Sequence, residues 1–154
     1  MKRITMDNKN FKKLHGFFIE DLNVGQNAEI TRKITEKDIN DFAVLTGDNN
    51  PVHTNEEFAK KTIFKQKVAH GFISASLIST VIATKLPGPG SIYLSQSLKF
   101  FAPVFINDEV MVRITVESLD YEKKRVKLIT ECFKLEKKII SGEAIVLVSS
   151  EKDY

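Results

Sequence analysis

The chain has very little cysteine: Cys132 is the only one among its 154 residues. A single cysteine cannot form a disulfide within the chain, whereas small secreted domains are usually rich in disulfides. A reducing compartment is the simplest interpretation, and we expect a cytoplasmic protein. Cys132 is also a poor candidate nucleophile, because it shares the alternating register of Val126 and Leu128 in a predicted strand.

Long apolar segments are equally scarce. The longest uncharged stretch, 71–84, has 14 residues, which is shorter than the roughly 20 needed to span a bilayer. The N-terminus is basic and polar and lacks the apolar centre of a signal peptide. We therefore expect no membrane segment. Residues 1–16 are interpreted as a loosely ordered extension before a single domain over residues 17–154.

Neither sign of charge dominates, since 23 Lys and Arg residues stand against 20 Asp and Glu residues, for a net charge of +3. The basic residues are scattered among acidic ones, whereas nucleic-acid binders usually gather them on one face. Metal binding is not indicated either, because the histidines lack H-x-H or H-x3-H spacing and the cysteine stands alone. The composition, with 42% hydrophobic residues, is that of an average globular protein.

Short-range signals predict helices in the first half of the chain. Thr35 with Asp38 three residues later forms a variant of the capping box, and Gly47 is a typical helix end. A polar loop is expected over residues 48–54, and a short helix capped by asparagine over residues 55–61.

The stretch 71–85 is apolar around most of the helix circumference, which predicts a buried helix. The rest of the sequence shows β-branched and alternating patterns. Strands are predicted at 27–34, 91–101, 109–117, 125–135 and 138–148. One buried helix followed by antiparallel strands indicates an α+β fold, with the sheet wrapped around the helix.

The polar loop D-N-N-P-V-H carries the first candidate site. Pro51 stiffens it and restricts Asn50 to an extended conformation, so Asp48 and His53 flank a bend. A carboxylate and an imidazole at this spacing can hold a water and exchange protons with it. A second interpretation is a turn in which Asp48 and Asn50 bond to local backbone while His53 is merely exposed.

The second candidate is V-A-H-G at 68–71, where the buried helix begins. Unpaired N–H groups and a partial positive charge at a helix N-terminus can polarise a carbonyl, and Gly71 allows a close approach. The alternative is an ordinary helix start, with Gly71 needed for packing and His70 a structural histidine.

Three segments together resemble the MaoC-like dehydratases, and most closely the (R)-specific enoyl-CoA hydratases. They are D-N-N-P-V-H at 48–53, V-A-H-G-F-I-S-A-S-L-I-S at 68–79, and the stretch 86–110. The resemblance runs over residues 17–148, most of the chain. It implies one hot-dog domain, a long antiparallel sheet wrapped around the helix 71–85.

The resemblance also implies an activity and an assembly. The expected reaction is hydration of trans-2-enoyl-CoA to (R)-3-hydroxyacyl-CoA, and the reverse dehydration, in fatty-acid or 3-hydroxyacyl-CoA metabolism. The chain would be a hydro-lyase acting on a thioester of CoA or of acyl carrier protein. No metal or redox cofactor is implied. A homodimer or higher homo-oligomer, with sheets joined edge to edge, is expected.

Site residues carry over position by position. Asp48 and His53 match the catalytic pair, and Gly71 matches the backbone donor to the thioester oxygen. Asn50 and Ser79 are assigned to the substrate pocket. The candidates for binding the CoA phosphates are four nearby lysines: Lys60, Lys61, Lys65 and Lys67. A solvated basic face explains that cluster equally well.

Two other functions stay open at this point. A hot-dog thioesterase would also need a carboxylate and a polarised thioester, although the D-x-N-P-x-H pairing suits water addition better. A non-catalytic acyl-thioester-binding protein of the same fold would be favoured by loss of Asp48 or His53, and both are present. Release of free CoA thiol distinguishes a thioesterase from a hydratase.

Overall fold

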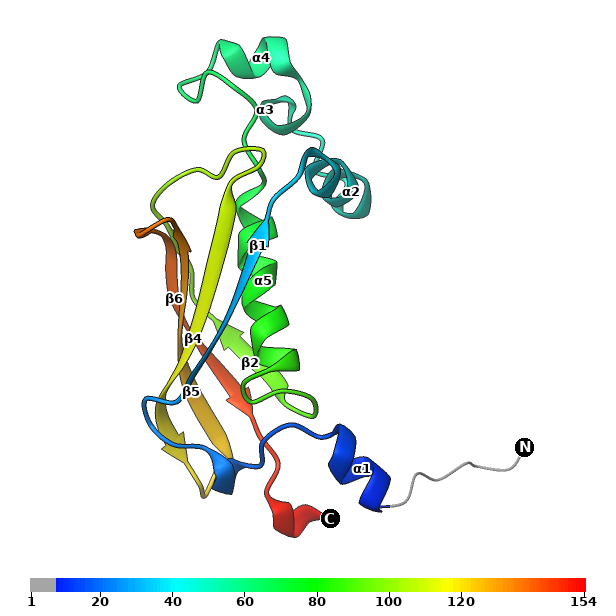
Figure 1. Cartoon of the computed structure of the whole chain (residues 1–154), viewed down its shortest axis with the longest axis vertical. Coiled ribbons are helices and arrows are strands. Elements are labelled where there is room, and N and C mark those ends of the chain that lie inside the picture. The colour runs from blue at the N-terminus through cyan, green and yellow to red at the C-terminus, as the bar shows by residue number, and fades with distance from the viewer. Residues whose placement is uncertain (1–7) are drawn as a thin grey trace, which may run out of the picture.

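The computed structural model describes residues 8–154, in which a curved antiparallel sheet lies against one long helix (Figure 1). The helices are α1 (Asn8–Leu14), α2 (Glu36–Thr46), α3 (Pro51–Thr54), α4 (Glu56–Lys60), α5 (Gly71–Thr84) and the 3-10 helices η1 (Ile19–Asp21) and η2 (Glu151–Asp153). The strands are β1 (Asn27–Lys33), β2 (Ile92–Gln96), β3 (Lys99–Phe100), β4 (Glu109–Asp120), β5 (Arg125–Lys134) and β6 (Lys137–Leu147). No helix in this part of the chain is long and apolar enough to cross a membrane.

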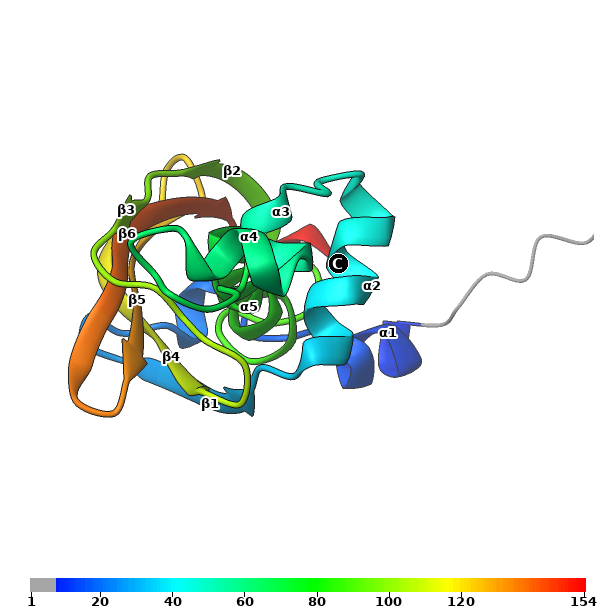
Figure 2. The same ribbon diagram turned by 90° about the horizontal axis from the view of Figure 1, so that it is seen from above.

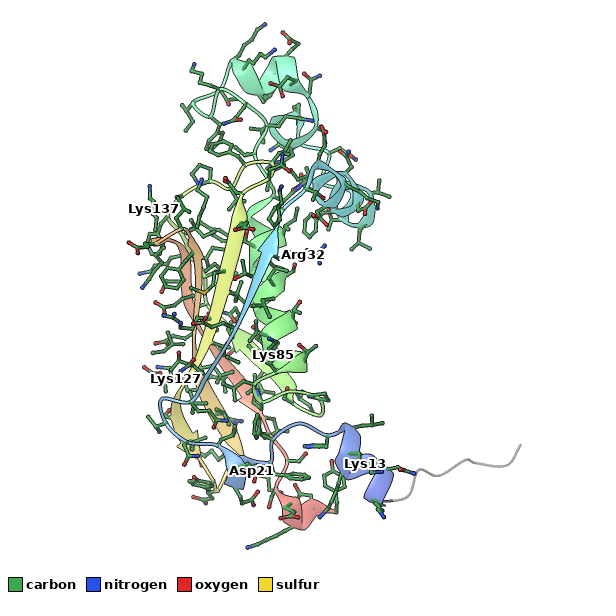
Figure 3. The ribbon with its side chains drawn as sticks, in the orientation of Figure 1. Lys13, Asp21, Arg32, Lys85, Lys127 and Lys137 are labelled. Carbon is green, nitrogen blue, oxygen red and sulfur yellow. The ribbon has the colours of Figure 1, made fainter. Side chains whose placement is uncertain are left out.

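The sheet is antiparallel throughout, in the order β1-β4-β5-β6-β2, and β3 also pairs with β6. The expected alternation is confirmed in β4, whose inward-facing residues are buried: Val110, Val112, Ile114 and Val116. The outer face carries several charged side chains. Lys127 projects from it (Figure 3) and forms ion pairs with Glu117 at 2.8 Å and with Glu143 at 3.0 Å. One face therefore meets the core and the other meets water.

Helix α5 occupies the concave side of the sheet (Figure 2). Its core-facing side chains are buried among those of β4 and β5: Ile73, Leu77, Ile78, Val81 and Ile82. Burying such apolar surface supplies the main driving force for folding. The expected α+β hot-dog fold is confirmed by this arrangement, a sheet curled around one long helix.

The expectation that α5 is buried nearly all round is wrong for the single chain. Phe72 is 62% exposed, and the same helix also exposes small and hydroxyl side chains: Ser76, Ser79, Thr80, Ala83 and Thr84. The sheet of one chain curls around only part of the helix, so the opposite side stays uncovered.

Local signals before the site are mostly confirmed. Thr35 forms the capping box of α2, and Gly47 ends that helix in the left-handed conformation at φ 75°. The predicted loop 48–54 is wrong in part, because it contains the short helix α3. Pro51 is tolerated at the first helical position, and the Asn50 side chain accepts a backbone N–H within α3, so this stretch can begin a helix.

The expected strand 91–101 is split into β2 and β3. The break occurs where the chain passes over Gly142 of β6, since a Cβ on that glycine would lie 1.7 Å from the backbone oxygen of Ser97. Glycine permits this close approach and lets both short strands pair with β6.

The described part of the N-terminal extension contains a helix and contacts the rest of the chain. It forms α1, where the ring centroid of Phe11 lies 4.3 Å from the ring centroid of Tyr154. The backbone after α1 donates hydrogen bonds to the turn 87–90. Residues 8–16 thus contact the rest of the chain, whereas residues 1–7 lie outside the described residues; the loosely ordered extension over residues 1–16 stays a prediction.

Candidate active site

A cavity of about 490 Å³ opens beside the N-terminal end of α5. Its walls are mostly apolar and combine the segment 100–104 with Ile139 and Ile140 of β6. The polar side chains among its lining residues are Asn50, His53 and Ser74. An apolar pocket with a few polar groups is typical of a site for a small molecule.

His53 lies in the wall of this cavity, on α3. Its Nδ1 is 2.8 Å from the backbone oxygen of Val68. A carbonyl oxygen only accepts, so Nδ1 carries the proton and Nε2 of the neutral ring has a free lone pair. Burial is the largest influence on His53 and lowers its pKa below the ordinary 6.5. The hydrogen bond to Val68 acts in the opposite direction and raises the pKa. The nearby His70 lowers the pKa further, and Asp48 raises it. The net lowering favours a neutral ring that can accept a proton.

Asp48 directly follows the glycine that ends α2, and its side chain is 51% exposed. Its Oδ1 accepts a hydrogen bond from the backbone N–H of Asn50 at 3.3 Å. The local turn that is the second interpretation of this loop is therefore formed. That turn still leaves Oδ2 of Asp48 at the site. Nitrogen or oxygen atoms of Asp48, His53 and His70 lie within 4.8 Å of one another. The structure therefore brings the predicted acid–base pair together.

His70 is the third member of this cluster, and the sequence interpretation did not assign it to the pair. It is 2% exposed, its Nε2 lies 2.9 Å from the backbone oxygen of Asp48, and its ring centroid lies 3.9 Å from that of His53. Because 22 positions separate His70 from Asp48, no local spacing could indicate the contact. The one feature of the sequence that could have indicated a role for His70 in the site is its position directly before the start of the buried helix.

Gly71 begins α5 and lines the cavity. The first N–H groups of a helix have no carbonyl partner within it, and the helix dipole adds a partial positive charge there. A Cβ on Gly71 would lie 2.9 Å from Cε1 of Phe100, so the absent side chain makes room for that ring. A helix N-terminus thus reaches the cavity close to His53.

His53 and the N-terminus of α5 therefore line one end of an apolar cavity, and the Asp48 carboxylate, which is not among the lining residues, lies next to His53. These groups can hold a water, accept its proton and stabilise an oxyanion. Their spacing would also suit a metal ion, since the ring nitrogens that do not donate to backbone carbonyls, His53 Nε2 and His70 Nδ1, each keep a lone pair. Burial raises the pKa of Cys132 to about 12, so its thiol stays protonated at neutral pH. Acid–base chemistry is what this arrangement supports best.

Residues 20–138 match the family described as MaoC like domain. The chain belongs to the MaoC-like family. It is 50% identical to the (R)-specific enoyl-CoA hydratase of Rhodospirillum rubrum over 131 residues, which cover 85% of this chain and 91% of that protein. It is 41% identical to the 3-hydroxybutyryl-CoA dehydratase of Methylorubrum extorquens over 140 residues, 91% of this chain and 89% of that protein. The unliganded R-hydratase PhaJ1 of Pseudomonas aeruginosa superposes with a TM-score of 0.84 and 42% identity, covering 88% of each chain.

In this MaoC-like domain, the two predicted pocket residues lie in different places. Asn50 lines the cavity, and its contact with substrate stays a prediction. Ser79 is exposed on α5 and lies outside the cavity, because it sits more than two helical turns beyond Gly71. Ser74, about one turn after Gly71, lines the cavity instead. Within one chain, Ser79 is therefore not part of the pocket.

The four predicted phosphate ligands of the MaoC-like domain lie on α4 or in the segment between α4 and α5. Two of them already pair with acids: Lys60 with Glu57 at 2.9 Å, and Lys67 with Glu36. The others, Lys61 and Lys65, are exposed. Phosphate binding by this group stays a prediction, and Lys61 and Lys65, which form no ion pair with the described residues, are its better candidates.

Proposed function

We propose that this chain catalyses the reversible syn hydration of trans-2-enoyl-CoA to (R)-3-hydroxyacyl-CoA. The observation that carries the proposal is the hydrogen bond from His53 Nδ1 to Val68, which leaves Nε2 as a proton acceptor in the cluster that contains Asp48. The names of two relatives, an (R)-specific enoyl-CoA hydratase and a 3-hydroxybutyryl-CoA dehydratase, describe the two directions of such a reaction.

In the proposed reaction, Asp48 and His53 hold one water over a face of the C2–C3 double bond. His53 Nε2 takes one proton as the water oxygen bonds to C3, while the Asp48 carboxylate accepts a hydrogen bond from the remaining O–H, which stays on the product, and stabilises the imidazolium. The electron pair of the double bond moves towards the thioester oxygen. His53 then returns the proton to C2 on the same face. The product carries the hydroxyl at C3 and the hydrogen at C2, so one water is consumed.

The rest of the substrate is assigned to the groups around the pair. The Gly71 N–H and the dipole of α5 stabilise the negative charge on the thioester oxygen. The apolar segment 100–104 contacts the acyl chain, and Lys61 and Lys65 are available to the CoA phosphates. We place the reaction in the cytoplasm, with no metal or redox cofactor, and with CoA as the thioester carrier in preference to acyl carrier protein.

The proposed function is tested by following the absorbance of crotonyl-CoA as its conjugated double bond is hydrated. We expect loss of absorbance without release of free thiol, and chiral analysis should show the (R)-3-hydroxy product. Thiol release in place of hydration would support the thioesterase. Binding of crotonyl-CoA without turnover would support a non-catalytic protein.

The pH dependence of hydration should follow the neutral form of His53. Burial lowers the pKa of this ring below 6.5, so the proton acceptor stays available at neutral pH and is lost as pH falls. We expect kcat/KM for crotonyl-CoA to be level around pH 7 and to fall on the acidic side with an apparent pKa below 6.5. An acidic limb above 6.5 would contradict a neutral His53 as the base.

We also propose that the chain forms a homodimer. Strand β2 ends the sheet, and its apolar residues Ile92 and Leu94 are 56% and 46% exposed. An apolar groove lies between α5 and β3, lined in part by Phe72 and Leu98. Pairing two chains here would bury an unpaired edge and the uncovered face of α5. Sedimentation at micromolar concentration should give about twice 17.5 kDa. A fully active protein at that monomer mass would contradict the dimer.

A further inference from the structure

His70 is a buried histidine of the site to which the proposed reaction gives no part. It is 2% exposed, immediately precedes Gly71, and contacts both Asp48 and His53. We propose that His70 is a positioning residue that holds Asp48 and His53 in their reactive arrangement. The inference rests on the proposed hydration, because that reaction defines which arrangement is reactive.

The first contact is the hydrogen bond to Asp48. His70 Nε2–H donates to the backbone oxygen of Asp48 at 2.9 Å, because a carbonyl oxygen can only accept. Two further hydrogen bonds of Asp48 are local, one from its N–H to Thr46 Oγ1 and one to its Oδ1 from the Asn50 N–H. The bond from His70 instead ties this exposed loop to the start of α5. It fixes where the carboxylate lies relative to the cavity.

The second contact is between the two imidazole rings. His53 is held at Nδ1 by one hydrogen bond, to the backbone oxygen of Val68. The His70 ring lies against it, with 3.9 Å between centroids and 32° between planes. Phe42 packs on His70 in turn, with 5.0 Å between centroids. This packing limits the swing of His53 and keeps its Nε2 directed at one place.

Stability alone does not account for a histidine at this position. Nδ1 of His70 is buried and has no hydrogen-bond partner, which destabilises a folded protein. A phenylalanine would fill a similar space without an unpaired nitrogen, and the Asp48 carbonyl, on an exposed loop, could bond to water instead. The bond to Asp48 and the contact with His53 are therefore the better explanation of this side chain.

The test compares two variants of His70 with a matched control. His70→Phe keeps a ring and removes the hydrogen bond, whereas His70→Gln keeps an N–H donor of similar reach and removes the ring. The control is His15→Phe. His15 also contacts a backbone oxygen, that of Gly16 at 3.0 Å, and stacks on Phe18 at 4.4 Å, but it lies near the turn that follows α5, away from the cavity.

We expect each His70 variant to lower kcat for crotonyl-CoA by about 10–10²-fold, because small displacements of catalytic groups have effects of this size. KM should change by less than about 3-fold, and the unfolding midpoint should stay close to that of the wild type. His15→Phe should keep the wild-type kcat. A wild-type kcat in His70→Phe would overturn the proposal, as would equal losses of kcat in His70→Phe and His15→Phe.

A second measurement does not depend on turnover. In NMR spectra of protein labelled with 15N at histidine, we expect the wild-type His53 to be a single Nδ1–H tautomer. In His70→Gln, which removes the ring that packs on His53, both tautomers should appear, because a ring that swings loses its fixed bond to Val68. An unchanged His53 signal would overturn the positioning role. A changed signal in a protein without hydratase activity would instead reject the proposed function and leave the positioning of the ring supported.

Discussion

Asp48→Asn and His53→Ala are each expected to lower kcat for crotonyl-CoA hydration by about 10²–10⁴-fold. Asparagine keeps the shape of the side chain and removes the negative charge that orients water and stabilises an imidazolium. Alanine removes the Nε2 lone pair altogether. Both groups act during proton transfer, so kcat should fall far more than KM changes. Initial rates of absorbance loss over a range of crotonyl-CoA concentrations measure both constants.

Folding should be nearly unaffected in both variants, because the Asp48 side chain is 51% exposed and His53 is half-buried on a short helix. Asp41→Asn is a matched control, since Asp41 is an exposed aspartate on α2 whose carboxylate pairs with Lys37. It should hydrate crotonyl-CoA at the wild-type rate. Near-normal activity in Asp48→Asn and His53→Ala would contradict the proposed mechanism.

Gly71→Val is expected to lower kcat by about 10²–10³-fold, the loss typical of one missing oxyanion donor. Negative charge develops on the thioester oxygen as water adds, so a donor at this point acts mainly on the transition state. A branched side chain would occupy the space at the N-terminus of α5 through which the thioester must approach. It would also meet Phe100, since a Cβ alone would lie 2.9 Å from that ring.

Two further variants separate the blocked N–H from the displaced ring. Gly71→Ala is smaller and suits a helix, so it should keep the fold and lose less activity than valine. Combining Gly71→Val with Phe100→Ala removes the ring that the new side chain meets; it should relieve the strain without restoring turnover. A normally folded Gly71→Val with wild-type hydration would show that the thioester oxygen lies elsewhere.

The elements that could be predicted from the sequence depend on signals that act within a few residues. The capping box at Thr35 and the left-handed end at Gly47 both form as expected. The alternation in β4 correctly separates its core face from its outer face, because side chains of a strand point to opposite sides in turn. The pair Asp48 and His53 belongs to the same class, since both residues lie on one short segment.

The features that could not be predicted depend on contacts between distant segments. His70 reaches Asp48 across 22 positions, and the cavity joins residues 100–104 to Ile139 and Ile140. Which residues meet there is set by how the loop after α2 folds back and by the close crossing at Gly142. The apolar pattern of α5 was also insufficient, because it cannot distinguish a face covered by the same chain from one that a second chain would cover.

The groups assigned to the chemistry all come from one continuous stretch, residues 48–71, whereas much of the apolar wall comes from Phe100 of β3, the segment 101–104 that follows it, and β6. In the proposed reaction, contacts to the acyl chain and the chemical step are therefore carried largely by separate parts of the sequence, although Val52, Phe64 and Val68 also line the cavity. Substitutions at Val104, Ile139 or Ile140 can reshape the wall while the acid–base pair stays in place. Natural selection, or a mutant library confined to these wall positions, can thus change substrate preference while the reaction stays the same.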